Sequence, residues 1–170
     1  MTKTTERDGR LEQVGDRWQI RFTRALAHSP EKVWRAITDA EHRKAWFPDT
    51  SIGDFETVGA RLQFEYPGGD FDGEVLAVDR PKLLEIRWGT DILRFELRPD
   101  GAGTVLVFSD TITEVGKGAR DTAGWHFCID RLESALDGTS PDGNPDWKVL
   151  NEMYVERFGP EASTMGPPDP

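Results

Sequence analysis

The chain has 170 residues and a formal net charge of −10, from 31 acidic and 21 basic residues. This length favours a single domain, and six tryptophans with nine phenylalanines exclude a disordered chain. The sequence contains no run of Lys and Arg, which a nucleic-acid binder needs to neutralise phosphates. No segment approaches the roughly 18 apolar residues of a membrane helix, and no apolar signal region follows Met1. We therefore expect a cytoplasmic protein with no nucleic-acid partner and no membrane insertion.

Alternating apolar and polar residues predict most of the strands. Residues 1–16 lack such a period, and we expect them to form a flexible leader. From Trp18 to Leu26 the alternation predicts a strand with one exposed face. The middle of the chain predicts further strands at residues 62–66, 71–78, 84–88, 93–97 and 104–112. Turn residues separate these strands by distances too short for parallel crossovers, so the strands should form an antiparallel meander.

Capping residues and helical spacing predict the helices. Ser29-Pro30-Glu31 combines an N-cap, a first-turn proline and an acid at the positive helix end. Thr38-Asp39 opens a second short helix, which should continue to Pro48. A longer helix is expected at about residues 119–136, where apolar residues repeat at helical spacing. Residues 138–170 are acidic and rich in proline, with a short amphipathic helix at about 145–158.

This order of elements predicts an α+β domain at about residues 17–137, in which an antiparallel sheet packs against one long helix. A curved antiparallel sheet of about six to seven strands should wrap around the long C-terminal helix, with two short helices after the first strand. One helix cannot fill the concave face of a wide sheet, so we expect a cavity between helix and sheet.

Several segments also resemble a known family. The first is SPEKVWRAITDAEH at residues 29–42, with Trp46-Phe47 behind it. The others are Phe71-Asp72-Gly73-Glu74-Val75, Arg80-Pro81, Gly103-Thr104-Val105 and Gly124-Trp125-His126. Together they resemble the SRPBCC or START-like helix-grip superfamily and, within it, the AHSA-like homologues of the activator of heat-shock-protein-90 ATPase. The resemblance implies that the domain at residues 17–137 has a helix-grip fold with an apolar cavity, in a superfamily whose members bind lipids or hormones, cyclise polyketides or act as co-chaperones in the stress response.

The sequence carries no catalytic motif. It has no nucleophile elbow, phosphate loop, dinucleotide fingerprint or metal-binding spacing of His and Cys, so we expect no cofactor and no metal. His28 and His42 lie beside or within a charged helix, which places them at the surface. His126 borders the apolar face of the long helix, either as a donor in the pocket or as a packed core residue. Cys128 is expected to be a small buried hydrophobe.

The carboxylates of the meander are expected on the exposed face of the sheet. They alternate with large apolar residues or flank a glycine, and cross-strand Arg87 and Arg94 should pair with them. These carboxylates belong to Glu65, Asp72, Glu74, Glu85 and Glu96. Nothing in the sequence identifies a carboxylate inside the cavity.

We expect the ligand site on the inward faces of three strands and on the apolar stripe of the long helix. The residues predicted to bind ligand are Leu62, Phe64, Tyr66, Leu84, Ile86, Trp88, Leu93, Phe95, Trp125, Cys128, Ile129 and Leu132. This arrangement favours a domain that binds a small hydrophobic or aromatic molecule. Two alternatives stay open: a cyclase- or hydratase-type enzyme in the same pocket, and a co-chaperone-like domain with a protein partner. Also open are a homodimer and the role of residues 139–158, which either cap the pocket or contact a partner.

Overall fold

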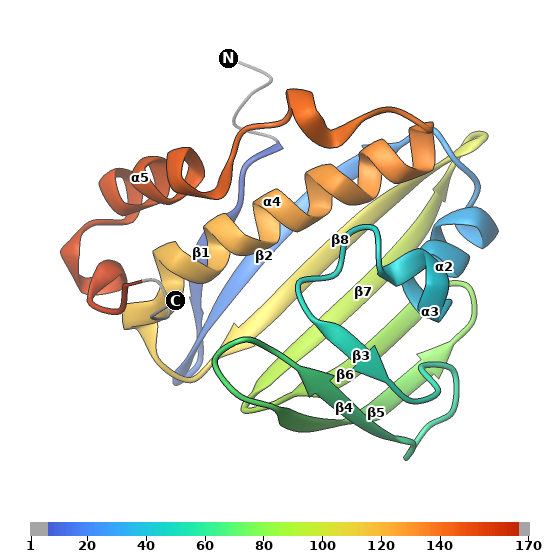
Figure 1. Ribbon diagram of the computed structural model, residues 1–170, viewed down its shortest axis with the longest axis horizontal. Coiled ribbons are helices and arrows are strands. Elements are labelled where there is room, and N and C mark those ends of the chain that lie inside the picture. The colour runs from blue at the N-terminus through green and yellow to red at the C-terminus, as the bar shows by residue number, and fades with distance from the viewer. Residues whose placement is uncertain (1–6, 167–170) are drawn as a thin grey trace.

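The computed structural model describes residues 7–166, which form an antiparallel sheet with helices on its concave face (Figure 1). Within this range the sheet has eight strands in the order β1-β2-β8-β7-β6-β5-β4-β3. The strands are β1 (Arg10–Val14), β2 (Arg17–Leu26), β3 (Thr50–Ile52), β4 (Arg61–Glu65), β5 (Phe71–Asp79), β6 (Leu83–Trp88), β7 (Asp91–Asp100) and β8 (Gly103–Ile112). The helices are α2 (Pro30–Thr38), α3 (Ala40–Arg43), α4 (Gly118–Asp137) and α5 (Trp147–Phe158), with 3₁₀ turns η1 (Val115–Lys117), η2 (Pro141–Gly143) and η3 (Pro160–Ser163).

The predicted fold class is confirmed, with two more strands at the edges than the alternation indicated. Strand β1 lies within the segment expected to be a flexible leader and pairs with β2, from Arg10 opposite Arg21 to Val14 opposite Arg17. The side chains of β1 are mostly exposed, so the strand is held in the sheet by its backbone hydrogen bonds to β2. For the same reason its sequence shows no alternation of apolar and polar residues. Strand β3 at the opposite edge has only three residues, too few to show a period.

The short helices begin where their capping residues predict. The Ser29 hydroxyl accepts a hydrogen bond from the Lys32 N–H at the start of α2, and Asp39 caps α3 in the same way. The second helix is shorter than expected, because α3 ends at Arg43. Trp46 and Phe47 follow it in a turn and are buried between the sheet and α4.

Helix α4 covers the concave face of the sheet (Figure 1). It ends at Gly138, whose φ of 71° is the left-handed conformation that glycine adopts without strain. Its apolar stripe is buried against the sheet through Trp125, Ile129 and Leu132. The core is therefore continuous from the inner face of the sheet to one side of the helix.

The opposite side of α4 is covered by α5. Leu150 and Tyr154 pack against Ala119 and Ala123 in a second, smaller apolar cluster. The segment after α4 thus lies against the helix in Figure 1 and brings Trp147 toward its N-terminal half. Within residues 7–166, no helix combines the length and the apolar composition needed to span a membrane.

Candidate functional site

A cavity of about 650 Å³ opens at the N-terminal end of α4, beside the turn between β6 and β7. Its wall combines elements from the sheet, from α4 and from the start of α5. The lining residues are Pro48, Tyr66, Phe71, Trp88, Gly89, Thr90, Asp91, Lys117, Arg120, Asp121, Gly124, Trp125 and Trp147. The cavity therefore has an aromatic part and a charged part.

Local backbone geometry brings these residues together. Gly89 has a φ of 63°, which permits the tight reversal between β6 and β7 and sets Trp88 opposite Asp91. On α4, Asp121 and Trp125 are four residues apart and so share one face of the helix. Trp147 reaches the same place from the first residue of α5.

Two tryptophans of the aromatic part are held in orientation by hydrogen bonds to carboxylates. The ring centroids of Trp88 and Trp125 lie 5.2 Å apart. The indole Nε1 of Trp88 donates to Asp49 at 3.1 Å, and that of Trp125 donates to Asp110 at 2.9 Å. Because both N–H groups are satisfied inside the protein, the rings offer mainly apolar surface to the cavity.

The charged part contains two carboxylates, those of Asp91 and Asp121, and a third, that of Asp110, lies behind them. Oxygen atoms of Asp91 on β7, Asp110 on β8 and Asp121 on α4 lie within 4.8 Å of one another. Lys117 Nζ donates to Asp91 at 2.9 Å, and Arg120 Nε donates to Asp121 at 2.8 Å. We call these three carboxylates the acid cluster.

Asp110 lies at the back of the acid cluster and is completely buried. Its Oδ2 accepts the Trp125 N–H, whereas its Oδ1 has no hydrogen-bond partner among residues 7–166. Burial, followed by the charges of Asp91 and Asp121, raises the pKa of Asp110 well above its usual range. Burial also raises the pKa of Asp121, although Arg120 and Lys117 act against this shift.

The acid cluster has the oxygen ligands and the spacing that a divalent cation requires. Lys117 and Arg120 already neutralise two of the three carboxylates, however, and would lie next to such an ion. The same geometry suits proton transfer or the binding of a group with a single positive charge. A buried carboxylate without a basic partner of its own attracts both a proton and such a cation.

The structure separates the predicted ligand residues into two groups. Tyr66, Trp88 and Trp125 line the cavity. The remaining residues are buried in the continuous core, away from the cavity wall: Leu62, Phe64, Leu84, Ile86, Leu93, Phe95, Cys128, Ile129 and Leu132. Aromatic residues after α3 fill the space there, since Phe47 packs between Phe64 and Trp125 with centroid distances of 6.1 and 5.8 Å.

The acid cluster was not predicted from the sequence. Asp91 directly follows the Gly89-Thr90 turn at the start of β7, and Asp121 lies in the first turn of α4, and acids are common at both kinds of position. Asp110 did carry a signal, because it follows Phe108 and precedes Ile112 on the inward face of β8. Of the carboxylates expected to pair with Arg87 and Arg94 on the exposed face, Asp72 pairs with Arg87 and Glu85 with Arg94.

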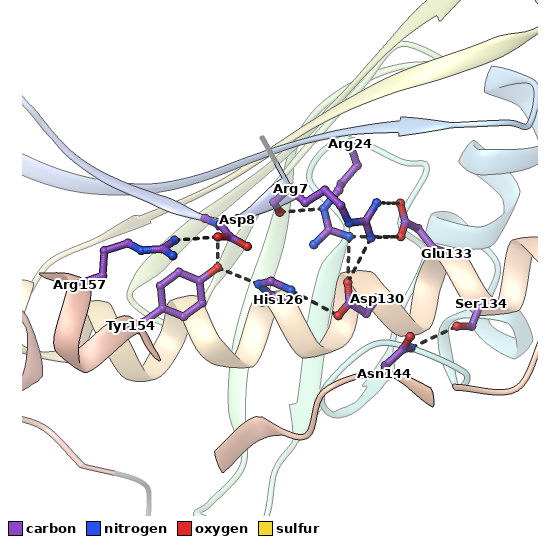
Figure 2. A network of polar contacts seen from close by, with 11 residues as sticks. Arg7, Asp8, Arg24, His126, Asp130, Glu133, Ser134, Asn144, Tyr154 and Arg157 are labelled. Atoms are coloured by element: carbon purple, nitrogen blue, oxygen red, sulfur yellow. Dashed lines mark hydrogen bonds and ion pairs between the residues drawn. The ribbon is translucent and has the colours of Figure 1, made fainter. Parts of the chain in front are cut away.

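His126 lies on the far side of α4 from the cavity, in the polar network of Figure 2. Tyr154 accepts a hydrogen bond from the Gly9 N–H at 2.8 Å, so its hydroxyl proton is free to be donated to His126 Nδ1 at 2.7 Å. The other ring nitrogen faces Asp130 at 3.3 Å, which in turn accepts from Arg24 at 2.9 Å. His126 therefore joins α5, α4 and β2 and is a packed polar residue of the interior.

Comparison with solved structures shows the same fold in bacterial proteins. A conserved protein of unknown function from Enterococcus faecalis superposes with a TM-score of 0.75 at 24% identity, covering 88% of this chain and 90% of the other. CalU16 from Micromonospora echinospora superposes with a TM-score of 0.69 at 20% identity, covering 89% of this chain and 94% of CalU16. DynU16 superposes with a TM-score of 0.64 at 25% identity, covering 72% of this chain and 49% of DynU16.

Among curated proteins, none matches this sequence significantly. A family model does match, that of the Activator of Hsp90 ATPase homolog 1-like proteins, over residues 27–137. This range begins just before α2 and ends with α4, and so contains the whole meander and most of the cavity wall. The chain therefore belongs to the Activator of Hsp90 ATPase homolog 1-like family.

Proposed function

We propose that this protein binds a small molecule with an apolar, aromatic body in the cavity beside Trp88 and Trp125. The observation that carries the proposal is the cavity itself: about 650 Å³, walled by the rings of Tyr66, Phe71, Trp88, Trp125 and Trp147. Ligand pockets of proteins hold roughly 300–1,000 Å³ and combine mostly apolar walls with a few polar groups. The size, the aromatic wall and the charged end all meet this description.

The relatives support a small-molecule role. DynU16 is described as a protein of the dynemicin biosynthetic locus, and a protein of such a locus is expected to meet small organic molecules. The co-chaperone alternative would need a contiguous exposed apolar surface. Within residues 7–166, the large exposed apolar side chains lie on β1, β3, the loop before β4, β5, α5 and the bend after η3, and no element carries more than two of them.

A binding experiment on Gly124 tests the proposal. A Cβ atom at this position would meet only Trp147 Nε1, at 3.9 Å, so a larger side chain would extend into the cavity. We expect N-phenyl-1-naphthylamine, a neutral probe that fluoresces in apolar surroundings, to bind the unmodified protein. Gly124→Leu should abolish this binding and leave the far-UV circular dichroism unchanged.

Gly143→Leu is the matched control, because Gly143 lies in η2 with open space around it and outside the cavity. It should bind the probe as the unmodified protein does. Equal binding to both leucine variants would show that the probe sits elsewhere and would contradict the proposal, as would no binding to the unmodified protein.

A second candidate function is acid–base catalysis on the bound molecule. The observation that favours it is Asp121, a carboxyl group in the cavity wall whose pKa is raised by burial. Such a group would remove a proton from an acidic C–H bond of the ligand and return one from solvent. We expect catalysed hydrogen–deuterium exchange at the α-carbons of 2-tetralone in D₂O, followed by NMR and lost in Asp121→Asn. Exchange at the uncatalysed rate would exclude this candidate for such ketones.

A further inference from the structure

The charge at the acid cluster is not balanced by the protein. Asp91 and Asp121 each have their own base, Lys117 and Arg120, at 2.9 and 2.8 Å. Asp110 has no base among residues 7–166, and its Oδ1 is buried without a hydrogen-bond partner. The cluster therefore carries one more negative charge than positive charges when its carboxyl groups are ionised.

Asp110 is directed toward the cavity side of the sheet. It shares the inward face of β8 with Phe108 and Ile112, and its oxygens reach the carboxylates of Asp91 and Asp121, which line the cavity. Burial, followed by the charges of Asp91 and Asp121, raises the pKa of Asp110, which favours a retained proton when no cation is present. An uncompensated buried carboxylate is costly, so a positive charge bound beside Asp91 and Asp121 would stabilise the ionised form of Asp110.

The remainder of the cavity suits an organic cation better than a metal ion. Tyr66, Phe71, Trp88, Trp125 and Trp147 surround the space next to the cluster, and the faces of such rings attract cations. A divalent ion would add two charges beside Lys117 and Arg120 and would leave the site with an excess of positive charge. One positive charge brings the sum to zero. The net charge of −10 on the whole chain also favours cations over anions.

We propose that the ligand of this cavity carries a single positive charge, an ammonium group on an apolar or aromatic body, and that this group binds at Asp91 and Asp121. The inference rests on the proposed function and names the class of molecule: a protonated amine whose body lies among the tryptophans. Asp110 then contributes its charge from behind the two carboxylates.

Three probes of nearly equal shape test this assignment: 1-naphthylmethylamine, 1-naphthylmethanol and 1-naphthylacetate. Isothermal titration at neutral pH gives the three dissociation constants for the unmodified full-length protein. We expect the amine to bind at least about tenfold more tightly than the alcohol, since a hydrogen bond to a charged group is worth about 1.5–3 kcal/mol. The acetate should bind more weakly than the alcohol. The indole N–H resonance of Trp125 should shift in the NMR spectrum when the amine binds.

Asp121→Asn should raise the dissociation constant of the amine to that of the alcohol and leave the alcohol unaffected. Asp100→Asn is the matched control, because Asp100 is exposed at the β7–β8 turn, and it should change neither value. The comparison of probes in the unmodified protein needs no variant, so it holds even where Asp121→Asn fails to fold.

The outcomes separate the two proposals. Equal binding of amine and alcohol would overturn the charge assignment and leave the proposed function standing. No binding by any of the three probes or by N-phenyl-1-naphthylamine would remove both. A shift of the Trp125 resonance with Mg²⁺ at millimolar concentration, and none with the amine, would assign the cluster to a metal ion and overturn the inference.

Discussion

Trp125 and Asp110 join helix α4 to strand β8 through a hydrogen bond of 2.9 Å between the indole Nε1 and the carboxylate Oδ2. Both side chains are buried, Asp110 completely. The bond fixes the orientation of a ring in the cavity wall and places an acid next to it. The packing of the helix on the sheet and the chemistry of the cavity thus depend on the same pair.

Two substitutions of Asp110 distinguish the roles of its oxygen atoms and of its charge. Asp110→Asn keeps an oxygen for Trp125 and supplies an N–H group to Asp91 or Asp121, so stability at about pH 8 should be equal or higher. Asp110→Ala leaves the indole N–H unpaired and should lower the free energy of unfolding by about 1–3 kcal/mol. Urea denaturation measures both. If Asp110→Asn lowered the free energy of unfolding as much as Asp110→Ala does, the carboxylate charge itself would stabilise the fold.

The raised pKa of Asp49 should make the stability of the protein depend on pH. Burial raises its pKa to about 7, against the opposing hydrogen bond from Trp88. Between the unfolded pKa of about 3.9 and pH 7 the folded state binds a proton that the unfolded state has lost, so stability falls as the pH rises through this window. Asp49→Asn should melt higher than the unmodified protein at pH 8 and equally at pH 4. Parallel pH profiles of melting temperature for the two proteins would contradict this.

Cys128 should be inert in the folded protein. Burial raises the pKa of its thiol to about 12, which lowers the thiolate fraction by about a thousandfold relative to an exposed thiol with a pKa near 9. We expect negligible alkylation by iodoacetamide at pH 8 under native conditions and rapid alkylation in guanidinium chloride, both followed by mass spectrometry. Similar rates in the two conditions would indicate that the thiol is accessible.

Tyr154→Phe should destabilise the attachment of α5. The variant keeps the ring on Ala119 and Ala123 but leaves the Gly9 N–H without its acceptor and His126 without its donor. The expected loss is about 1–3 kcal/mol in the free energy of unfolding. Phe158→Leu, which changes a partly buried ring of the same cluster without removing a hydrogen bond, provides the comparison and should cost less. If Tyr154→Phe lowered the free energy of unfolding by less than Phe158→Leu does, water would be replacing the hydroxyl group as a hydrogen-bond partner.

Strong local signals made most of the fold predictable from the sequence. The alternation in β2 and β6 and the Ser29 cap of α2 each specify an element by contacts between near neighbours. β1 could not be predicted in this way, because its pairing with β2 uses backbone groups that any sequence offers.

The location of the cavity depended on packing between distant segments. The helix stripe and the inner faces of the strands were identified as buried, but which of them enclose a void is decided by Trp46 and Phe47. These two rings occupy the space above Phe95 and Phe64, with centroid distances of 6.1 Å in both pairs, and so close the middle of the interface. The space that remains lies at the end of α4, where Asp121 and the turn at Gly89 meet.

The hydrogen bond from Gly9 to Tyr154 joins segments 145 residues apart in the sequence. Together with the ion pair between Arg157 and Asp8, at 2.8 Å, it ties the residues just before β1 to helix α5. Neither segment belongs to the central hairpins of the sheet, because β1 is an edge strand paired with β2 and α5 packs on the outer side of α4. Strand β1 and helix α5 should therefore open together as one unit of local unfolding, with their amide protons exchanging at a common rate while those of β6, β7 and β8 stay protected.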